Sequence, residues 1–91
     1  MDITVCLMKA TGETEMRTVE DATFDKLRKI IGCRNAEYVP LKGGNALLVD
    51  EEGLLKEEPQ YNEFASLNAK RHIVGDALAV RLSDMDEIPY K

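Results

Sequence analysis

The sequence has little of the chemistry on which metal sites and many active sites depend. Its 91 residues include two cysteines, one histidine and no tryptophan. Cys6 and Cys33 form no CxxC pair, and with a single histidine the chain cannot supply the four ligands of a structural zinc site. We therefore expect no metal and no other cofactor. Both cysteines are expected to be reduced and to behave as small hydrophobic residues.

An excess of positive charge is also missing. Twelve Lys and Arg stand against 17 Asp and Glu, which gives a net charge of -5. Binding to nucleic acid or to anionic lipid depends on neutralising phosphates, so we expect neither as a direct partner. The first nine residues carry no basic segment, and Lys9 interrupts their apolar run. We therefore expect this segment to be neither a signal peptide nor a membrane span. The expected location is the cytoplasm, or the host cell's cytoplasm if a phage encodes the protein.

What is present suffices for one small α+β domain over residues 1–91. Hydrophobic residues make up 44% of the chain and charged residues 32%. Period-two alternation and turn residues predict strands at 3–8, 15–19, 36–41, 46–49 and 73–82, with a further short strand beginning at Leu54. Helices are predicted from the capping residues Asp21 or Thr23 to Gly32, and from Asn62 to Arg71.

This order predicts a mainly antiparallel sheet of five to six strands with two helices packed on one face. Residues 83–91 are predicted to form a polar C-terminal tail. The apolar positions that fall on matching faces should share one core: Ile3, Val5, Leu7, Phe24, Leu27, Ile31, Leu48, Phe64, Leu67, Leu78 and Val80.

The densest charged feature is acidic and comprises Asp50, Glu51, Glu52, Glu57 and Glu58. Consecutive acids in a hairpin do not offer the alternating oxygen ligands of a calcium loop. The cluster is therefore either a solvated turn, whose like charges protect a sheet edge, or a patch that docks on a basic protein surface. Under the second interpretation these five acids bind a partner protein.

No constellation for catalysis stands out. His72 and Asp76 could orient an imidazole for acid–base work, but no motif places a serine or cysteine as their nucleophile. A histidine at a helix end that bonds backbone carbonyls is the more common arrangement. We therefore predict that the protein is not an enzyme and has no catalytic residues.

A small anionic or nucleotide ligand is the alternative. Gly43 and Gly44 lie between predicted strands and so mark a hairpin rather than a phosphate loop, which would lead into a helix. The basic residues Lys26, Arg28, Lys29, Arg34 and Lys42 are explained by an exposed helix face, although a few cations suffice to bind one or two phosphates. Such a binder would be a homo-oligomer, because subunit interfaces supply the depth that a small monomer lacks. The candidate ligand-binding residues are Tyr38, Lys42, Asn45, Asn62, Arg71 and His72.

From Ile31 onward, about two thirds of the chain resembles a family of short phage, plasmid and bacterial proteins, the domain-of-unknown-function family 3846. The resembling segments are Ile31-Gly32, Glu37-Tyr38-Val39-Pro40-Leu41, Leu48-Val49-Asp50-Glu51-Glu52-Gly53, Asn62 with Ala65, and Ile73-Val74-Gly75-Asp76-Ala77-Leu78. The family usually has Asn in place of Asp50. The resemblance implies an accessory protein of a mobile element with an α+β fold, and it carries over no catalytic residue.

Together these observations predict a non-catalytic, acidic binding protein, encoded by a phage or another mobile element, that modulates a host protein or a defence pathway. The alternative is an oligomeric protein that binds or sequesters a small anionic or nucleotide ligand. Small molecules released from the heated, purified protein would distinguish the two, because a stoichiometric nucleotide would favour the second.

Overall fold

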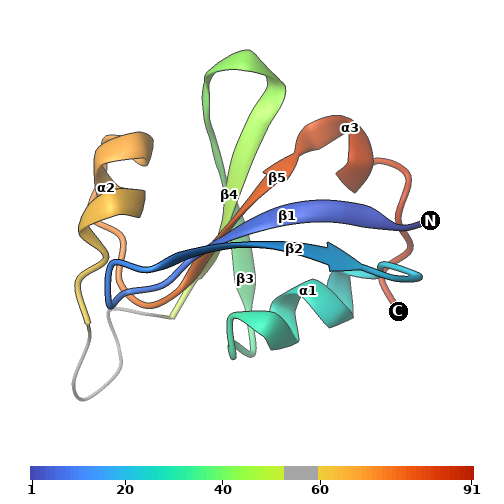
Figure 1. The fold of residues 1–91 in the computed structure, drawn as a ribbon, viewed down its shortest axis with the longest axis horizontal. Coiled ribbons are helices and arrows are strands. Elements are labelled where there is room, and N and C mark those ends of the chain that lie inside the picture. Colours follow the sequence, from blue (N-terminus) through green and yellow to red (C-terminus); the bar gives the residue numbers. More distant parts are fainter. Residues whose placement is uncertain (53–59) are drawn as a thin grey trace.

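The computed structural model describes residues 1–52 and 60–91, which form an antiparallel sheet with helices on both of its faces (Figure 1). The predicted strand at Leu54 and the acids Glu57 and Glu58 lie outside the described residues. The elements follow in the order β1 (Ile3–Met8), β2 (Thr14–Val19), α1 (Phe24–Ile30), β3 (Ala36–Pro40), the 3-10 turn η1 (Lys42–Gly44), β4 (Asn45–Asp50), α2 (Glu63–Ala69), β5 (Ala77–Arg81) and α3 (Leu82–Met85).

The sheet has five strands in the order β2-β1-β5-β4-β3, and every neighbouring pair is antiparallel. Both expected hairpins form: β1 pairs with β2 along its whole length, and β3 pairs with β4 across the glycine turn. Gly43 and Gly44 both have φ of +77°, the left-handed conformation that glycine adopts without steric cost. The predicted antiparallel α+β class is confirmed.

The face of the sheet that α1 covers holds the larger core. We call this set the α1 cluster: Ile3, Val5, Leu7, Val19, Ala22, Leu27, Ile31, Cys33, Ala46, Leu48, Leu78 and Val80. Every residue predicted for the core belongs to it or packs against it, except two. The exceptions, Phe64 and Leu67, are 47% and 69% exposed, so their assignment to the core is wrong.

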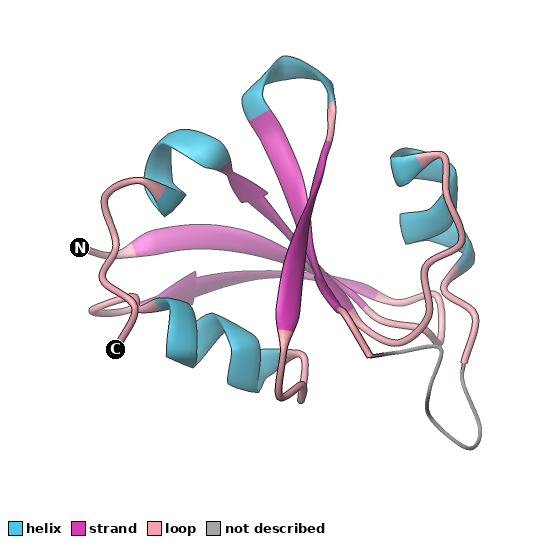
Figure 2. Cartoon of the chain, turned by 180° about the vertical axis from the view of Figure 1, so that it is seen from behind, coloured by secondary structure: helices cyan, strands magenta, loops and turns pink. Residues whose placement is uncertain are grey.

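The two predicted helices do not share a face. Helix α2 packs against the opposite side of the sheet, in a second set that we call the α2 cluster: Met8, Val39, Leu47, Val49, Ala65, Ile73 and Ala77. Neighbouring residues of a strand point to opposite faces, so β4 places Leu48 under α1 and Leu47 under α2. An apolar run such as 46–49 is buried on both faces and therefore requires cover on both. Figure 2 shows the two helices far apart at different ends of the twisted sheet.

The C-terminal segment is packed rather than a free polar tail. Its first residues form α3, and Met85 and Ile88 pack against the α1 cluster. The backbone N–H groups of Phe24 and Asp25 donate to the carbonyls of Pro89 and Tyr90, both at 2.9 Å. These contacts hold the C-terminus against the start of α1, near the N-terminus (Figure 1).

Candidate functional site

The segment around α2 is held by one buried polar side chain, that of Asn62. Its Oδ1 accepts the N–H of Ala65 at 3.1 Å and so caps the helix, as the sequence predicts. Its Nδ2 donates to the carbonyls of Met8 and Gly75, both at 2.9 Å. The side chain is 1% exposed and bonded at both ends, so its amide serves as an anchor of the fold.

Small side chains turn toward the sheet from α2. Ala65 and Ser66 are buried, and Ala69 packs against the α2 cluster. The Ser66 hydroxyl accepts the N–H of Ile73 at 2.8 Å and donates to the carbonyl of the same residue at 3.2 Å. Because these side chains are short, the helix can lie close to the segment that leads into β5.

The large apolar side chains of α2 consequently point to solvent. Phe64 and Leu67 are three positions apart and therefore share one side of the helix. Tyr61 precedes the helix and is 49% exposed, with its ring stacked on that of His72 at a centroid distance of 4.7 Å. We call Tyr61, Phe64 and Leu67 the α2 patch. Large apolar side chains left exposed on one helix and just before it are candidates for a binding surface.

An acidic pocket adjoins the end of this segment. Glu37, Asp50 and Glu51 line it together with Arg71 and His72. Arg71 Nη2 lies 3.2 Å from Glu37 Oε1, so one of the pocket's acids is paired within the chain. The structure thus brings residues of both predicted sites, the acidic one and the ligand-binding one, into a single pocket.

Two of the acids in the predicted acidic patch form hydrogen bonds within the chain. Asp50 Oδ1 accepts the N–H of Glu52 at 2.9 Å, and Glu52 Oε1 accepts the side-chain amide of Asn35 at 2.8 Å. Two of the acids therefore stabilise the turn after β4. Glu51 is the exposed acid in the described part of this turn, whereas Asp50 and Glu52 are half-buried.

The structure does not bring the six candidate ligand-binding residues together. Arg71 and His72 line the acidic pocket, whereas Lys42 and Asn45 line a shallow cavity with Lys70. Tyr38 lies on the α1 face of the sheet, where its ring meets Phe24 edge-on at 5.9 Å. Burial there raises the pKa of the Tyr38 phenol.

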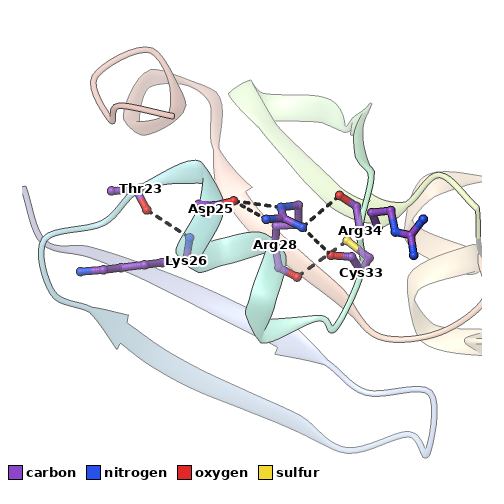
Figure 3. Close-up of polar contacts among 6 residues, drawn as sticks. All are labelled: Thr23, Asp25, Lys26, Arg28, Cys33 and Arg34. Atoms are coloured by element: carbon purple, nitrogen blue, oxygen red, sulfur yellow. Dashed lines mark hydrogen bonds and ion pairs between the residues drawn. The ribbon is translucent and has the colours of Figure 1, made fainter. Parts of the chain in front are cut away.

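Two of the three basic residues of α1, Lys26 and Arg28, bond the chain itself, which weakens their case as an anion site; Figure 3 shows the contacts of Arg28. Arg28 donates to the backbone carbonyls of Cys33 and Arg34 and pairs with Asp25. The hydrogen bond between the side chains of Arg28 and Asp25 lowers the pKa of Asp25 and raises that of Arg28. Lys26 Nζ donates to the carbonyls of Glu20 and Asp21, both at 3.0 Å.

The residues weighed for catalysis have other contacts. Asp76 Oδ1 accepts the N–H of Ala10 at 3.0 Å, while the His72 ring lies on Tyr61. Cys33 is buried, with its Sγ donating to the carbonyl of Arg28 at 3.7 Å. Within residues 1–52 and 60–91, no three His, Cys, Asp or Glu gather as a metal site would require.

The α2 patch is the feature that sequence reasoning missed. Phe64 and Leu67 have helical spacing, but so do Ala65 and Ala69 on the other side of the helix. Because Phe64 and Leu67 are the larger side chains, the sequence predicts that their side is buried, and this prediction is wrong. The only signal for the actual orientation is Ser66 beside Ala65. A serine can be buried when its hydroxyl forms hydrogen bonds to a neighbouring segment, as Ser66 does with Ile73. The hydrophobic pattern alone does not show that such a segment lies beside the helix.

No curated protein and no solved structure matches the chain. In the part of the chain that the structure describes, none of the helices is long and apolar enough to cross a membrane. A family model described as "Domain of unknown function (DUF3846)" matches residues 3–89, which covers all of the elements described above, and the chain therefore belongs to this family.

Proposed function

We propose that this protein is a non-catalytic binding protein that recognises a partner protein through the α2 patch and the acids beside it. The observation that carries the proposal is the orientation of α2, which buries alanine and serine and exposes phenylalanine and leucine. Burying Phe64 and Leu67 would have stabilised the fold, since a large apolar side chain contributes about 1.5–3 kcal/mol when removed from water. Their exposure is explained if a partner buries them.

The charges around the patch favour a partner with basic groups. Glu63 is exposed in the first turn of α2 and Lys70 is exposed at its end, while the described lining of the acidic pocket has Glu37, Asp50 and Glu51 against Arg71. The chain as a whole has a net charge of -5. We therefore propose a partner segment that presents apolar side chains flanked by Lys or Arg. Such charges would accelerate association, while the apolar contacts would supply most of the affinity.

The proposed setting is the cytoplasm, where cysteines outside disulfides, such as Cys6 and Cys33, are common. If a phage or another mobile element carries the gene, the partner is a host protein, and binding modulates its activity or a defence pathway. A role as a sequestering protein for a small anion has less support, because its candidate residues are spread over separate surfaces.

A selection from a random peptide library tests the proposal. The wild-type protein should enrich peptides that combine apolar residues with Lys or Arg. Replacing Phe64 and Leu67 together by serine should weaken binding of those peptides about 10-fold or more, as the loss of central apolar contacts does in other interfaces. The matched control is Leu82→Ser, which removes an exposed leucine from α3, at the other end of the molecule (Figure 1).

A second pair of variants tests the acids. Glu51→Gln with Glu63→Gln should slow association and reduce its salt dependence, whereas Glu13→Gln with Glu87→Gln, which removes as much charge elsewhere, should leave both unchanged. The proposal is contradicted if no peptides are enriched, or if the Phe64 and Leu67 variant binds them as tightly as the wild type.

A further inference from the structure

We propose that two copies of this chain associate through strand β2, whose edge pairs with the same edge of the second copy and so extends the sheet across both. The two strands run antiparallel around a two-fold axis at Met16. This interface is separate from the α2 patch and holds whether or not that patch binds a partner.

Strand β2 is a complete and accessible sheet edge. It forms one end of the strand order and pairs residue for residue with β1 from Thr14 to Val19. No other strand of the described chain lies against its outer side. Four of its six residues are exposed, and it contains neither proline nor glycine. An edge of this kind offers a row of unpaired N–H and C=O groups to another strand.

The other edge of the sheet is guarded in ways that β2 is not. Strand β3 ends in Pro40, which cannot donate to a ladder. Its Glu37 is bonded to Arg71, and its Tyr38 packs against Phe24. Self-association by strand pairing is therefore directed to β2.

The side chains of β2 are complementary to themselves in one register. When Met16 lies opposite Met16 of the second copy, Glu15 lies opposite Arg17 and Thr14 opposite Thr18, and each pair occurs twice. Opposite charges that face each other across two strands stabilise the pairing. Within one chain Arg17 Nη2 lies 2.9 Å from Glu15 Oε1, and Lys9 Nζ lies 3.8 Å from Glu15 Oε2, so this edge already carries opposite charges side by side.

The neighbouring registers are less favourable. Residues that pair across the two-fold axis must point to the same face of the continuous sheet, so the axis passes where one residue lies opposite its own copy. Each alternative register is therefore named by the residue on which it is centred. Centring on Glu15 places that carboxylate opposite itself, and centring on Arg17 does the same for the guanidinium. Like charges directly opposite each other are destabilising, so of these three registers the one centred on Met16 is favoured.

The proposed pairing also covers apolar surface. Met16 is 68% exposed and projects on the face opposite α1, beside its β1 neighbour Cys6. Helix α2 covers only part of this face, and a hollow lined by Thr4, Cys6, Met16, Asn45, Ala79 and Arg81 remains open. Contact between the two Met16 side chains would bury apolar area at the rim of this hollow.

Charge exchange between two variants provides the test. Wild-type protein should form a dimer in sedimentation velocity and native mass spectrometry. Glu15→Arg alone places two arginines opposite each other, and Arg17→Glu alone places two glutamates opposite each other, so each variant should dimerise about 10-fold or more weakly. A mixture of the two variants restores opposite charges in both pairs. It should therefore form heterodimers that are more stable than the homodimer of either variant.

The controls separate this interface from effects within one chain. Glu13→Arg changes the net charge as much as Glu15→Arg does, but residue 13 lies opposite Val19 in the proposed register, so dimerisation should persist. Circular dichroism should show that all variants keep the fold, since residues 13 and 15 are exposed and residue 17 is only partly buried. The proposal is overturned if the wild type stays monomeric at its highest soluble concentration, or if mixing the two variants produces no heterodimer.

Discussion

At the residue scale, Asn62 connects three parts of the chain that are distant in sequence. It caps α2, holds the end of β1 through the Met8 carbonyl, and holds the approach to β5 through the Gly75 carbonyl. Its own N–H donates to the carbonyl of Ile73 at 2.9 Å. One buried amide therefore sets where the helix with the α2 patch stands relative to the sheet.

Replacing this amide should be costly. In Asn62→Ala the helix loses its cap, and two buried carbonyls lose their donor, so we expect the free energy of unfolding to fall by about 3 kcal/mol. Urea denaturation measures this loss. Asn62→Asp keeps the cap but removes the donor, and it should also destabilise the protein at neutral pH. A loss below about 0.5 kcal/mol in Asn62→Ala, the range of surface substitutions, would contradict the anchoring role.

At the scale of elements, α1 and α2 use their apolar residues in opposite ways. Helix α1 buries Leu27 completely and packs Phe24 and Ile30 against the same cluster. Helix α2 buries Ala65 and leaves Leu67 69% exposed. Only α1 behaves as an ordinary amphipathic helix of a small domain, and this contrast is the basis of the binding role proposed for α2.

Two leucine substitutions measure this contrast directly. Leu27→Ala should lower the free energy of unfolding by about 2–5 kcal/mol, because it removes a fully buried side chain. Leu67→Ser should change it by less than about 0.5 kcal/mol, because its side chain is mostly in water. Urea denaturation of both variants provides the comparison. Equal losses would mean that Leu67 is buried as Leu27 is, and would contradict the proposed α2 patch.

At the scale of the whole molecule, the C-terminus closes the core beneath α1. Ile88 packs against the α1 cluster, and Tyr90 stacks on Phe24 at a centroid distance of 5.2 Å. The two backbone hydrogen bonds from the start of α1 to residues 89 and 90 complete this contact. The segment is thus part of the fold, although its composition is largely polar.

Removing residues 86–91 should therefore destabilise the domain. The loss comprises two backbone hydrogen bonds, the aromatic pair and part of the burial of Ile88, at about 1 kcal/mol each, or about 4 kcal/mol in total. Thermal unfolding should show a lower midpoint, with the antiparallel sheet still visible by circular dichroism at low temperature. An unchanged midpoint would mean that the segment behaves as the free tail predicted from its polarity.

Local patterns accounted for most of the fold. The alternation of Ile3, Val5 and Leu7 predicts a strand with one face in the core. Of the two cap candidates for the first helix, Thr23 and not Asp21 caps α1, and Asn62 caps α2 as predicted. The last strand begins at Ala77 rather than at residue 73, because Gly75 has φ of +77° and Val74 forms only an isolated bridge with Tyr61. Periodicity depends on neighbours in sequence, so it locates elements better than it locates such breaks.

The sequence by itself determined the antiparallel α+β class, the residues under α1, the helix caps and the negative charge, because each follows from local spacing or from composition. Only the tertiary structure decided which side of α2 faces the sheet, that α1 and α2 cover opposite faces, and that the acidic turn meets Arg71 and His72 in one pocket. These outcomes depend on contacts between distant segments, such as those of Asn62 with Met8 and of Ser66 with Ile73. A hydrophobic pattern shows that a helix has two sides, whereas the hydrogen-bond partners available in the folded chain decide which side is buried.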